Sequence, residues 1–266
     1  MYNQHSLTSL CASLCDIMGI QAPTQANPKL DEFTDKVKSL LDGKTADRIV
    51  MYNPDAIAQW IYQKYPFLLD EVSCRCDIKQ PFCTVMPSVT PVCFGTMYTG
   101  AQPCVHGIQA YVKPVIKIDT IFDALIHAGK KPVIIVTAGD SLSKIYLERD
   151  MDYFIYPTVE QVNAKAVEVL LKDEYDFIVI YNKNFDATMH KFGPESTEAL
   201  AELKANARIF GMISEIIESH WSHHNVLLGF AMDHGCHEID GGCGQHGLDM
   251  EEDLNIVHQY KVFKRK

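Results

Sequence analysis

Three acidic residues that could take part in catalysis or metal binding come at or shortly after the ends of short apolar runs of this chain. They are Asp55, Asp186 and Asp233. Burying a carboxylate is costly unless it is paired or bound to a cation, so an acidic residue at the end of an apolar segment is not explained by packing. We therefore treat these positions as candidate metal ligands.

Histidines accompany two of these acidic residues. Asp186 and His190 are four positions apart, which places both side chains on one face of a helical turn. Asp233 is followed by His234 and then by Gly235, which allows a sharp turn and the close approach of a ligand. Carboxylate oxygens and imidazole nitrogens together are typical ligands of zinc.

A third histidine lies in a glycine-rich segment near the C-terminus. His246 belongs to the segment 241–247, which contains four glycines. Such a loop can fold back and bring His246 to the same place as Asp233, although a flexible surface turn would have the same composition.

A hydroxyl group stands at a predicted junction between a strand and a helix. Thr90 precedes Pro91, and proline suits the first turn of a helix. Free backbone N–H groups at a helix N-terminus favour an anion such as phosphate. Thr90 could cap the helix and also act as a nucleophile, and Ser88 is the competing hydroxyl.

Apolar runs rich in Val, Ile and Leu alternate with helical patterns along the chain, which indicates a mostly parallel sheet covered on both faces. Open sheets of this kind bind ligands beyond the carboxyl ends of their strands, where the candidate residues fall. We predict a three-layer α/β/α sandwich. The predicted strands are 48–53, 82–86, 132–137, 176–181 and 225–232, and the predicted helices between them are 119–128, 158–172 and 194–220.

Two amphipathic stretches precede this pattern, at 5–19 and 30–41. We predict that residues 1–46 form a helical extension packed on the core and that residues 47–266 form a single catalytic domain. The extension would shape the substrate pocket or form a homodimer contact.

The bulk composition limits the classes of partner. The formal net charge of -10 argues against a nucleic-acid polymer, because binding its backbone requires a basic face. No apolar run is long enough for a membrane helix, and there is no secretory signal pattern, so we predict a cytoplasmic protein that does not bind a membrane. The nine scattered cysteines argue against a disulfide framework, and the cluster of Cys74, Cys76 and Cys83 lacks the spacing of a structural zinc site.

Other signals are set aside. The segment 43–45 (Gly-Lys-Thr) resembles part of a phosphate-binding loop but precedes a predicted strand instead of following one. His106 is expected to shape its turn. Cations suit the C-terminus of a helix, and we assign this role to His220, His223 and His224.

The set of motifs resembles the alkaline phosphatase superfamily, especially its nucleotide pyrophosphatase/phosphodiesterase-like branch. In that family the nucleophile precedes a Thr-Gly pair by nine positions, a Pro-x-x-His-Gly segment follows, and three metal-binding motifs come later in a fixed order. The matching residues here are Thr90 with Thr99 and Gly100, the segment 103–107, Asp186 with His190, Gly193 and Pro194, Asp233 with His234, and His246.

The resemblance implies an alkaline phosphatase-like fold with two divalent metal ions, zinc or alternatively manganese. One metal would be held by Asp186, His190 and His246. The other would be held by Asp55, Thr90, Asp233 and His234. The residue Asp55 departs from the family pattern, which has Asp-Gly, because Ala56 follows it here.

Further departures concern the substrate. The family's phosphate-binding Asn is replaced by Tyr111, and Lys113 and Lys183 are candidates to supply positive charge. The Cys/Ser-x-Pro-x-Arg pattern of sulfatases is absent at Thr90, and the chain has little room for the cap of the mutases.

The resemblance implies a hydrolase of phosphomonoesters or phosphodiesters that acts on a small phosphorylated substrate, such as a nucleotide, through a phosphothreonine at Thr90. The choice between monoester and diester stays open. Alternatives are a phosphomutase, a phosphonate hydrolase with the same metals, or a member that binds metal or nucleotide without turnover.

Overall fold

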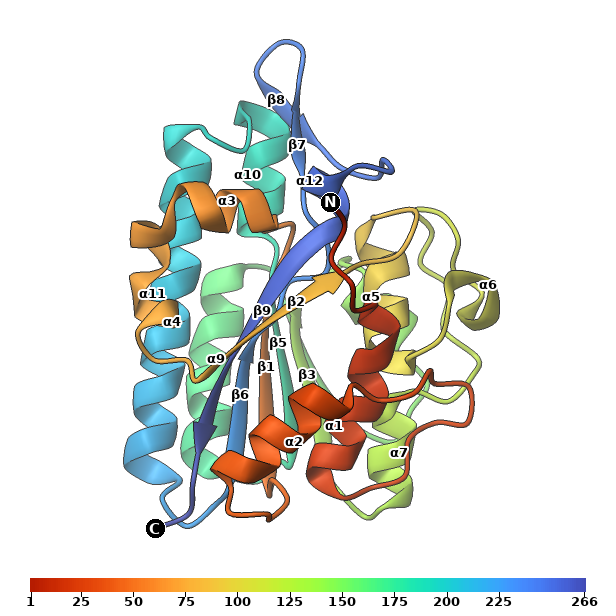
Figure 1. The fold of residues 1–266 in the computed structure, drawn as a ribbon, viewed down its shortest axis with the longest axis vertical. Helices are drawn as coiled ribbons and strands as arrows, with labels where there is room; N and C mark the ends of the chain where they lie inside the picture. The colour runs from red at the N-terminus through yellow and green to blue at the C-terminus, as the bar shows by residue number, and fades with distance from the viewer.

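A computed structural model describes residues 1–266, which contain one seven-stranded sheet and a small hairpin (Figure 1). The order of strands across the large sheet is β2-β9-β6-β1-β5-β3-β4. The hairpin pairs β7 with β8. The strands are β1 (Arg48–Pro54), β2 (Ile78–Cys83), β3 (Pro132–Thr137), β4 (Asp152–Tyr156), β5 (Phe177–Asn182), β6 (Val226–Phe230), β7 (His237–Ile239), β8 (Cys243–Gln245) and β9 (Asn255–Phe263).

Helices connect most of these strands. The 3-10 helices are η1 (Leu7–Ser9) and η2 (Pro66–Leu69), and the α-helices are α1 (Leu10–Met18), α2 (Asp31–Leu40), α3 (Gln59–Lys64), α4 (Asp70–Ser73), α5 (Thr90–Thr99), α6 (Pro103–His106), α7 (Ile121–His127), α8 (Leu142–Ile145), α9 (Val159–Lys172), α10 (Asn184–Phe192), α11 (Thr197–His220) and α12 (Glu251–Leu254). No helix has the length and apolar character needed to cross a membrane.

The predicted mostly parallel sheet between two helical layers is confirmed. Strands β6, β1, β5, β3 and β4 run parallel, and β9 pairs antiparallel with both β6 and β2. Every residue of β3 and β5 is buried, as expected for strands covered on both faces.

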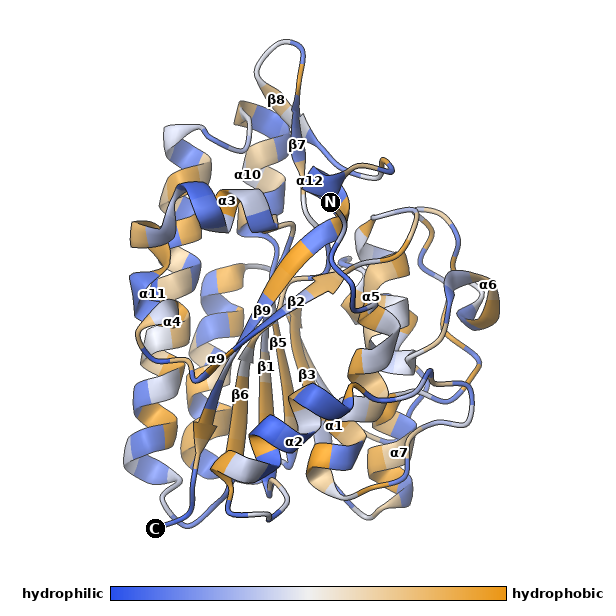
Figure 2. Cartoon of the chain, in the orientation of Figure 1, coloured by the Kyte–Doolittle hydropathy of each residue, from blue (hydrophilic) through white to orange (hydrophobic).

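The helices lie in two groups on opposite faces of the sheet (Figure 1). The group α1, α2, α5 and α7 covers one face, and α9, α10 and α11 cover the other. Figure 2 shows that the strands are largely hydrophobic, whereas the helices carry hydrophilic residues on their outer sides. The molecule therefore has one hydrophobic core in two parts, one on each side of the sheet.

The N-terminal helices bury their apolar residues in this same core. Leu10, Leu14 and Ile17 of α1 are fully buried, and α1 packs against α2, α5 and α7. The side-chain amide of Asn3 donates to the carbonyl of Phe82, which ties the N-terminal segment to β2. The division of the chain at residue 46 stays a prediction.

The sequence pattern misplaced one strand and missed four. The predicted strand 82–86 is wrong, because β2 ends at Cys83 and the chain then turns toward Thr90. Strand β4 was missed because it is an edge strand with half-exposed residues and has no continuous apolar run. Strand β9 was missed because polar side chains such as His258 and Gln259 are buried in it, and the short hairpin strands β7 and β8 carry no pattern at all.

Candidate metal centre and nucleophile

The carboxyl ends of β1, β5 and β6 bring the predicted metal ligands together. These three strands are neighbours in the sheet, with β1 in the middle. Asp55 follows β1, the helix α10 with Asp186 follows β5, and Asp233 follows β6. In each of two groups of three side chains, the ligand atoms lie within 4.8 Å of one another. The groups are Asp55 with Asp233 and His234, and Asp186 with His190 and His246.

The first group is fully enclosed. Asp55 is 1% exposed, and Asp233 and His234 are not exposed at all. His234 Nε2 lies 3.4 Å from Asp55 Oδ1 and 3.3 Å from Asp233 Oδ2. The same nitrogen lies 3.3 Å from Thr90 Oγ1. One imidazole nitrogen therefore faces two carboxylate oxygens and the candidate nucleophile at once.

The second group lies closer to solvent. Asp186 Oδ1 lies 3.2 Å from His190 Nε2 and 3.5 Å from His246 Nε2. The ring of His246 stacks on the ring of His234 with centroids 4.1 Å apart, so the two groups adjoin each other. The expectation that the glycine-rich segment folds back is met, since the β7–β8 hairpin precedes His246 and returns the chain to the site.

The three histidines are oriented in the same manner. Their Nδ1 atoms lie 3.0, 2.8 and 2.9 Å from backbone carbonyl oxygens, those of Gly244, Ser88 and Gly235. An Nδ1–H that donates to a carbonyl leaves Nε2 with a free lone pair, which is the arrangement found around metal-binding histidines. In each case Nε2 points toward a carboxylate. The histidines in question are His190, His246 and His234.

Three buried carboxylate oxygens of these two groups have no hydrogen-bond partner. They are Asp55 Oδ1, Asp186 Oδ1 and Asp233 Oδ2, the same atoms that face the imidazole Nε2 atoms. Buried polar groups are almost always satisfied, and an orphan oxygen is costly. A divalent cation in each group would satisfy these oxygens, so the donor set fits two metal ions.

Two glycines allow the close approaches that build the site. A Cβ at Gly235 would lie 2.0 Å from the carbonyl oxygen of Glu252. A Cβ at Gly244 would lie 2.5 Å from the sulfur of Met189. Gly244 thus lets β8 contact α10, where its carbonyl meets His190.

The electrostatics of the first group are unfavourable for an ion-free carboxylate pair. Burial, together with the charges of Asp233 and Asp186, raises the pKa of Asp55 well above its usual range. Burial raises the pKa of Asp233 to about 8 and lowers the pKa of His234 to about 3. Burial and mutual repulsion thus disfavour the ionised form of both carboxyl groups, and His234 is neutral and cannot offset their charge. A bound cation would supply the missing positive charge and favour the ionised carboxylates.

Thr90 begins helix α5 and is 3% exposed. Its hydroxyl is placed to donate to the free Nε2 of His234, at 3.3 Å. The competing hydroxyl of Ser88 is fully buried and has no hydrogen-bond partner, while its carbonyl holds His246. Of the two hydroxyls, only that of Thr90 contacts a predicted ligand.

The predicted substrate residues lie around a carboxylate that the sequence analysis missed. Lys183 Nζ donates to Asp140 Oδ1 at 3.1 Å. Lys113 Nζ donates to the carbonyl of Gly139 at 3.0 Å and lies 5.1 Å from the ring centre of Tyr111. Asp140 follows β3, so its place after a predicted strand was the available signal.

A second missed residue contacts a predicted ligand directly. The hydroxyl of Tyr181 donates to Asp55 Oδ2, and Tyr181 is the last but one residue of β5. Burial and the nearby charge of Asp55 raise the pKa of Tyr181 well above its usual range, so it stays a donor. Its position at the carboxyl end of a predicted strand could have identified it.

His106 plays the structural part expected of it. Its Nε2 lies 3.0 Å from Thr96 Oγ1, and its Nδ1 accepts from the backbone N–H of Ile108. Burial lowers the pKa of His106 to about 4, so it is neutral.

Comparison with protein families gives a match in the second half of the chain. The model of the type I phosphodiesterase/nucleotide pyrophosphatase family matches residues 137–265. This range contains Asp186, His190, Asp233, His234 and His246, and it leaves out the segment with Thr90.

Curated relatives include two snake-venom enzymes. A venom phosphodiesterase of Macrovipera lebetinus is 33% identical over 97 residues, which cover 32% of this chain and 11% of the relative. Venom phosphodiesterase 2 of Crotalus adamanteus is 38% identical over 64 residues, which cover 24% of this chain and 8% of the relative. The chain thus spans about a tenth of the length of the curated relatives it matches.

Solved structures share the fold at low sequence identity. Murine ectonucleotide pyrophosphatase/phosphodiesterase 5 matches with a TM-score of 0.58 and 18% identity, over 73% of this chain and 58% of that one. Phosphonoacetate hydrolase from Sinorhizobium meliloti 1021 matches with a TM-score of 0.57 and 18% identity, over 76% of this chain and 61% of that one. The family match over residues 137–265 confirms that this chain resembles the type I phosphodiesterase/nucleotide pyrophosphatase family, and the solved structures show that it shares their fold.

Proposed function

We propose that this chain hydrolyses phosphoesters with two divalent metal ions and with Thr90 as the nucleophile. The observation that carries the proposal is the set of three orphan carboxylate oxygens, each facing the Nε2 of a histidine whose Nδ1 is bonded to a carbonyl. The family match over residues 137–265 and the names of the relatives support the same reaction class.

Each group would hold one metal. Asp186, His190 and His246 would bind the first, and Asp55, Asp233 and His234 would bind the second, with Thr90 beside it. Zinc suits this mixture of imidazole and carboxylate, and manganese is the alternative. Bound metals would stabilise negative charge on the reacting oxygens and favour the ionised hydroxyl.

Thr90 and the first turn of α5 would carry out and orient the phosphoryl transfer. The hydroxyl of Thr90 gives its proton to solvent as Oγ1 attacks phosphorus and forms a phosphothreonine, and the ester oxygen takes up a proton from water and leaves as an alcohol. Water then attacks the same phosphorus, which releases the phosphate product and restores the hydroxyl. Since Thr90 starts α5, free backbone N–H groups of the first helical turn favour the negative charge of the phosphoryl group.

The substrate is proposed to be a small phosphorylated molecule such as a nucleotide. An inactive form of murine ectonucleotide pyrophosphatase/phosphodiesterase 5 has been solved in complex with AMP, and it matches this chain with a TM-score of 0.56. Lys113, Lys183 and Tyr111 would contact the part of the substrate beyond the reacting phosphate. Phosphonoacetate belongs in any substrate panel because the bacterial neighbour acts on a phosphonate.

The test is turnover of p-nitrophenyl phosphate and bis-p-nitrophenyl phosphate by metal-stripped protein repleted with zinc or manganese. We expect metal-dependent release that falls in Thr90→Ala by on the order of 10³-fold or more, as for other nucleophile deletions. The faster substrate would identify the preferred ester class.

Ser88→Ala is the matched control. It removes the neighbouring hydroxyl, which contacts no ligand, and should retain most of the activity. Loss of activity in Ser88→Ala with retention in Thr90→Ala would transfer the nucleophilic role to Ser88. No metal-dependent release from either ester or from phosphonoacetate would contradict the proposal.

A further inference from the structure

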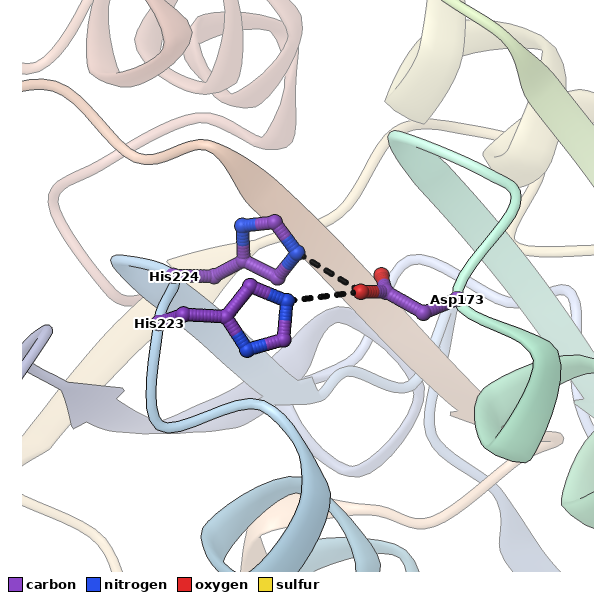
Figure 3. Close-up of side chains that lie close together, drawn as sticks. All are labelled: Asp173, His223 and His224. Carbon is purple, nitrogen blue, oxygen red and sulfur yellow. Dashed lines mark hydrogen bonds and ion pairs between the residues drawn. The ribbon is translucent and has the colours of Figure 1, made fainter.

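A third group of metal-ligand type lies at the opposite edge of the sheet, at the amino ends of β5 and β6 (Figure 3). Asp173 follows helix α9, and His223 and His224 lie in the turn between α11 and β6. Helix α11 ends at His220, so favourable interaction with the end of a helix explains His220 alone. The convergence of the other two histidines on Asp173 needs another explanation.

Both imidazoles point at one oxygen atom. His223 Nε2 lies 3.0 Å and His224 Nε2 lies 2.8 Å from Asp173 Oδ2. The ring centroids are 4.0 Å apart, and the three ligand atoms lie within 4.8 Å of one another. Two imidazole nitrogens and one carboxylate oxygen that converge in this way form a partial coordination shell for zinc or a similar transition metal.

Neighbouring contacts hold the three side chains in place. Arg48 Nε donates to Asp173 Oδ1 at 3.2 Å, which fixes the carboxylate and leaves Oδ2 to the imidazoles. The buried Trp221 donates from Nε1 to the carbonyl of Leu170 in α9 at 2.9 Å. The backbone N–H of His224 donates to the carbonyl of Trp221. The turn with the two histidines is thereby anchored to the helix that ends at Asp173.

The charge and exposure of the group suit a cation from solution. Although burial alone would raise the pKa of Asp173, its bonds with His224 and Arg48 lower it, so the carboxylate is ionised. The side chain of His223 is 61% exposed. Arg48 is shared with Asp176, so its positive charge is already paired twice.

We propose that Asp173, His223 and His224 bind one transition-metal cation, such as zinc, at a site separate from the two catalytic metals. The bound cation links the end of α9 to the turn before β6. These two segments lie 50 residues apart in the sequence. The cation replaces the Nε2 protons that the two histidines donate to Asp173, and these protons are released to solvent. Because the three ligand atoms already lie together, neither segment has to rearrange.

The test is the zinc content of the intact 266-residue chain, measured by mass spectrometry after dialysis against a buffered free-zinc concentration. We expect the double variant His223→Ala/His224→Ala to hold one zinc ion per chain less than the wild type. The matched control His220→Ala, an exposed histidine of the same stretch, should hold the same amount as the wild type. Equal zinc content in the wild type and the double variant would overturn the proposal.

A second variant separates metal binding from hydrogen bonding. Asp173→Asn keeps an oxygen acceptor for the imidazoles but removes the negative charge, and we expect it to weaken zinc binding at this site at least tenfold in a calorimetric titration. Unchanged affinity in this variant, with a folded circular dichroism spectrum, would overturn the role of Asp173 as a ligand.

The zinc-content comparison does not depend on the proposed hydrolase activity. The measurement is a difference between two proteins with the same catalytic residues, so it holds whether the carboxyl-end site binds two metals, one or none. Turnover by the double variant should equal that of the wild type.

Discussion

Strands β6, β1 and β5 carry aspartates and histidines at both of their ends. At the carboxyl ends, Asp55, Asp233 and His234 are almost completely buried. At the amino ends, the side chains of Asp173 and His223 are 21% and 61% exposed. The residue types are the same, but the surroundings of the proposed catalytic site and of the proposed cation site differ in two ways.

The first difference is the compensation of charge. Arg48 neutralises part of the charge of Asp173, whereas Asp55 Oδ1 and Asp233 Oδ2 have no partner at all. The second is orientation. Backbone carbonyls hold the Nδ1 atoms of His234 and the other carboxyl-end histidines, while those of His223 and His224 have no hydrogen-bond partner. At the carboxyl ends, the buried carboxylate oxygens have no partner and the histidines are held in place, so a bound cation is needed to offset the cost of burial. At the amino ends, Asp173 is already paired with Arg48, so a cation can bind there but is not needed.

The largest expected difference in turnover is between an Asp→Asn substitution at the carboxyl end and the same substitution at the amino end. Asp233→Asn should lower metal-dependent turnover by on the order of 10³-fold or more, because a ligand and its charge are lost beside the nucleophile. Asp173→Asn should change turnover by less than about twofold, since strand length alone places it roughly 17–20 Å from the reaction. Steady-state rates on p-nitrophenyl phosphate esters would measure both. Similar losses in the two variants would mean that the two ends are not independent.

The sequence predicts the ligands at the carboxyl ends of the strands better than the contacts at the amino ends. Asp186 and His190 share a helical turn and Asp233 and His234 are adjacent, so local spacing was enough to propose them as ligands. The sheet topology then explains why they meet, since parallel neighbours end at one edge.

Contacts across the fold were not predictable in this way. Asp173 and His223 lie on different connections, and nothing in their spacing indicates that they meet. The bond from Tyr181 to Asp55 likewise depends on the register of β5 beside β1, which the sequence does not specify. Strand β9 was missed for a related reason, because the buried Gln259 breaks the apolar pattern.

A smaller effect is expected from Tyr181 near the carboxyl end of β5. Tyr181→Phe removes the hydroxyl that donates to Asp55 at the carboxyl end of β5. We expect metal affinity to fall roughly 10- to 100-fold, as for other groups that orient a ligand, with kcat largely recovered at saturating metal. Tyr175→Phe is the control, because Tyr175 precedes β5 and donates to Asp152.

Metal titrations of activity would distinguish the two variants. An activation midpoint that shifts in Tyr181→Phe and stays fixed in Tyr175→Phe would identify Tyr181 as a positioning residue. A fall in kcat that excess metal does not recover would instead assign Tyr181 a contact with the reacting groups.

The smallest effect concerns stability at the amino end. A ligand that binds only the folded chain stabilises it by about 1.4 kcal/mol when its free concentration is ten times its dissociation constant. For a chain of this size that corresponds to a rise of about 3–6 °C in the melting temperature. We expect zinc to raise the melting temperature of Asp233→Asn protein, whose carboxyl-end site is weakened, and to raise it less when His223→Ala/His224→Ala is added. Equal shifts with and without the two histidines would assign all zinc stabilisation to other sites and remove the binding role of the amino end.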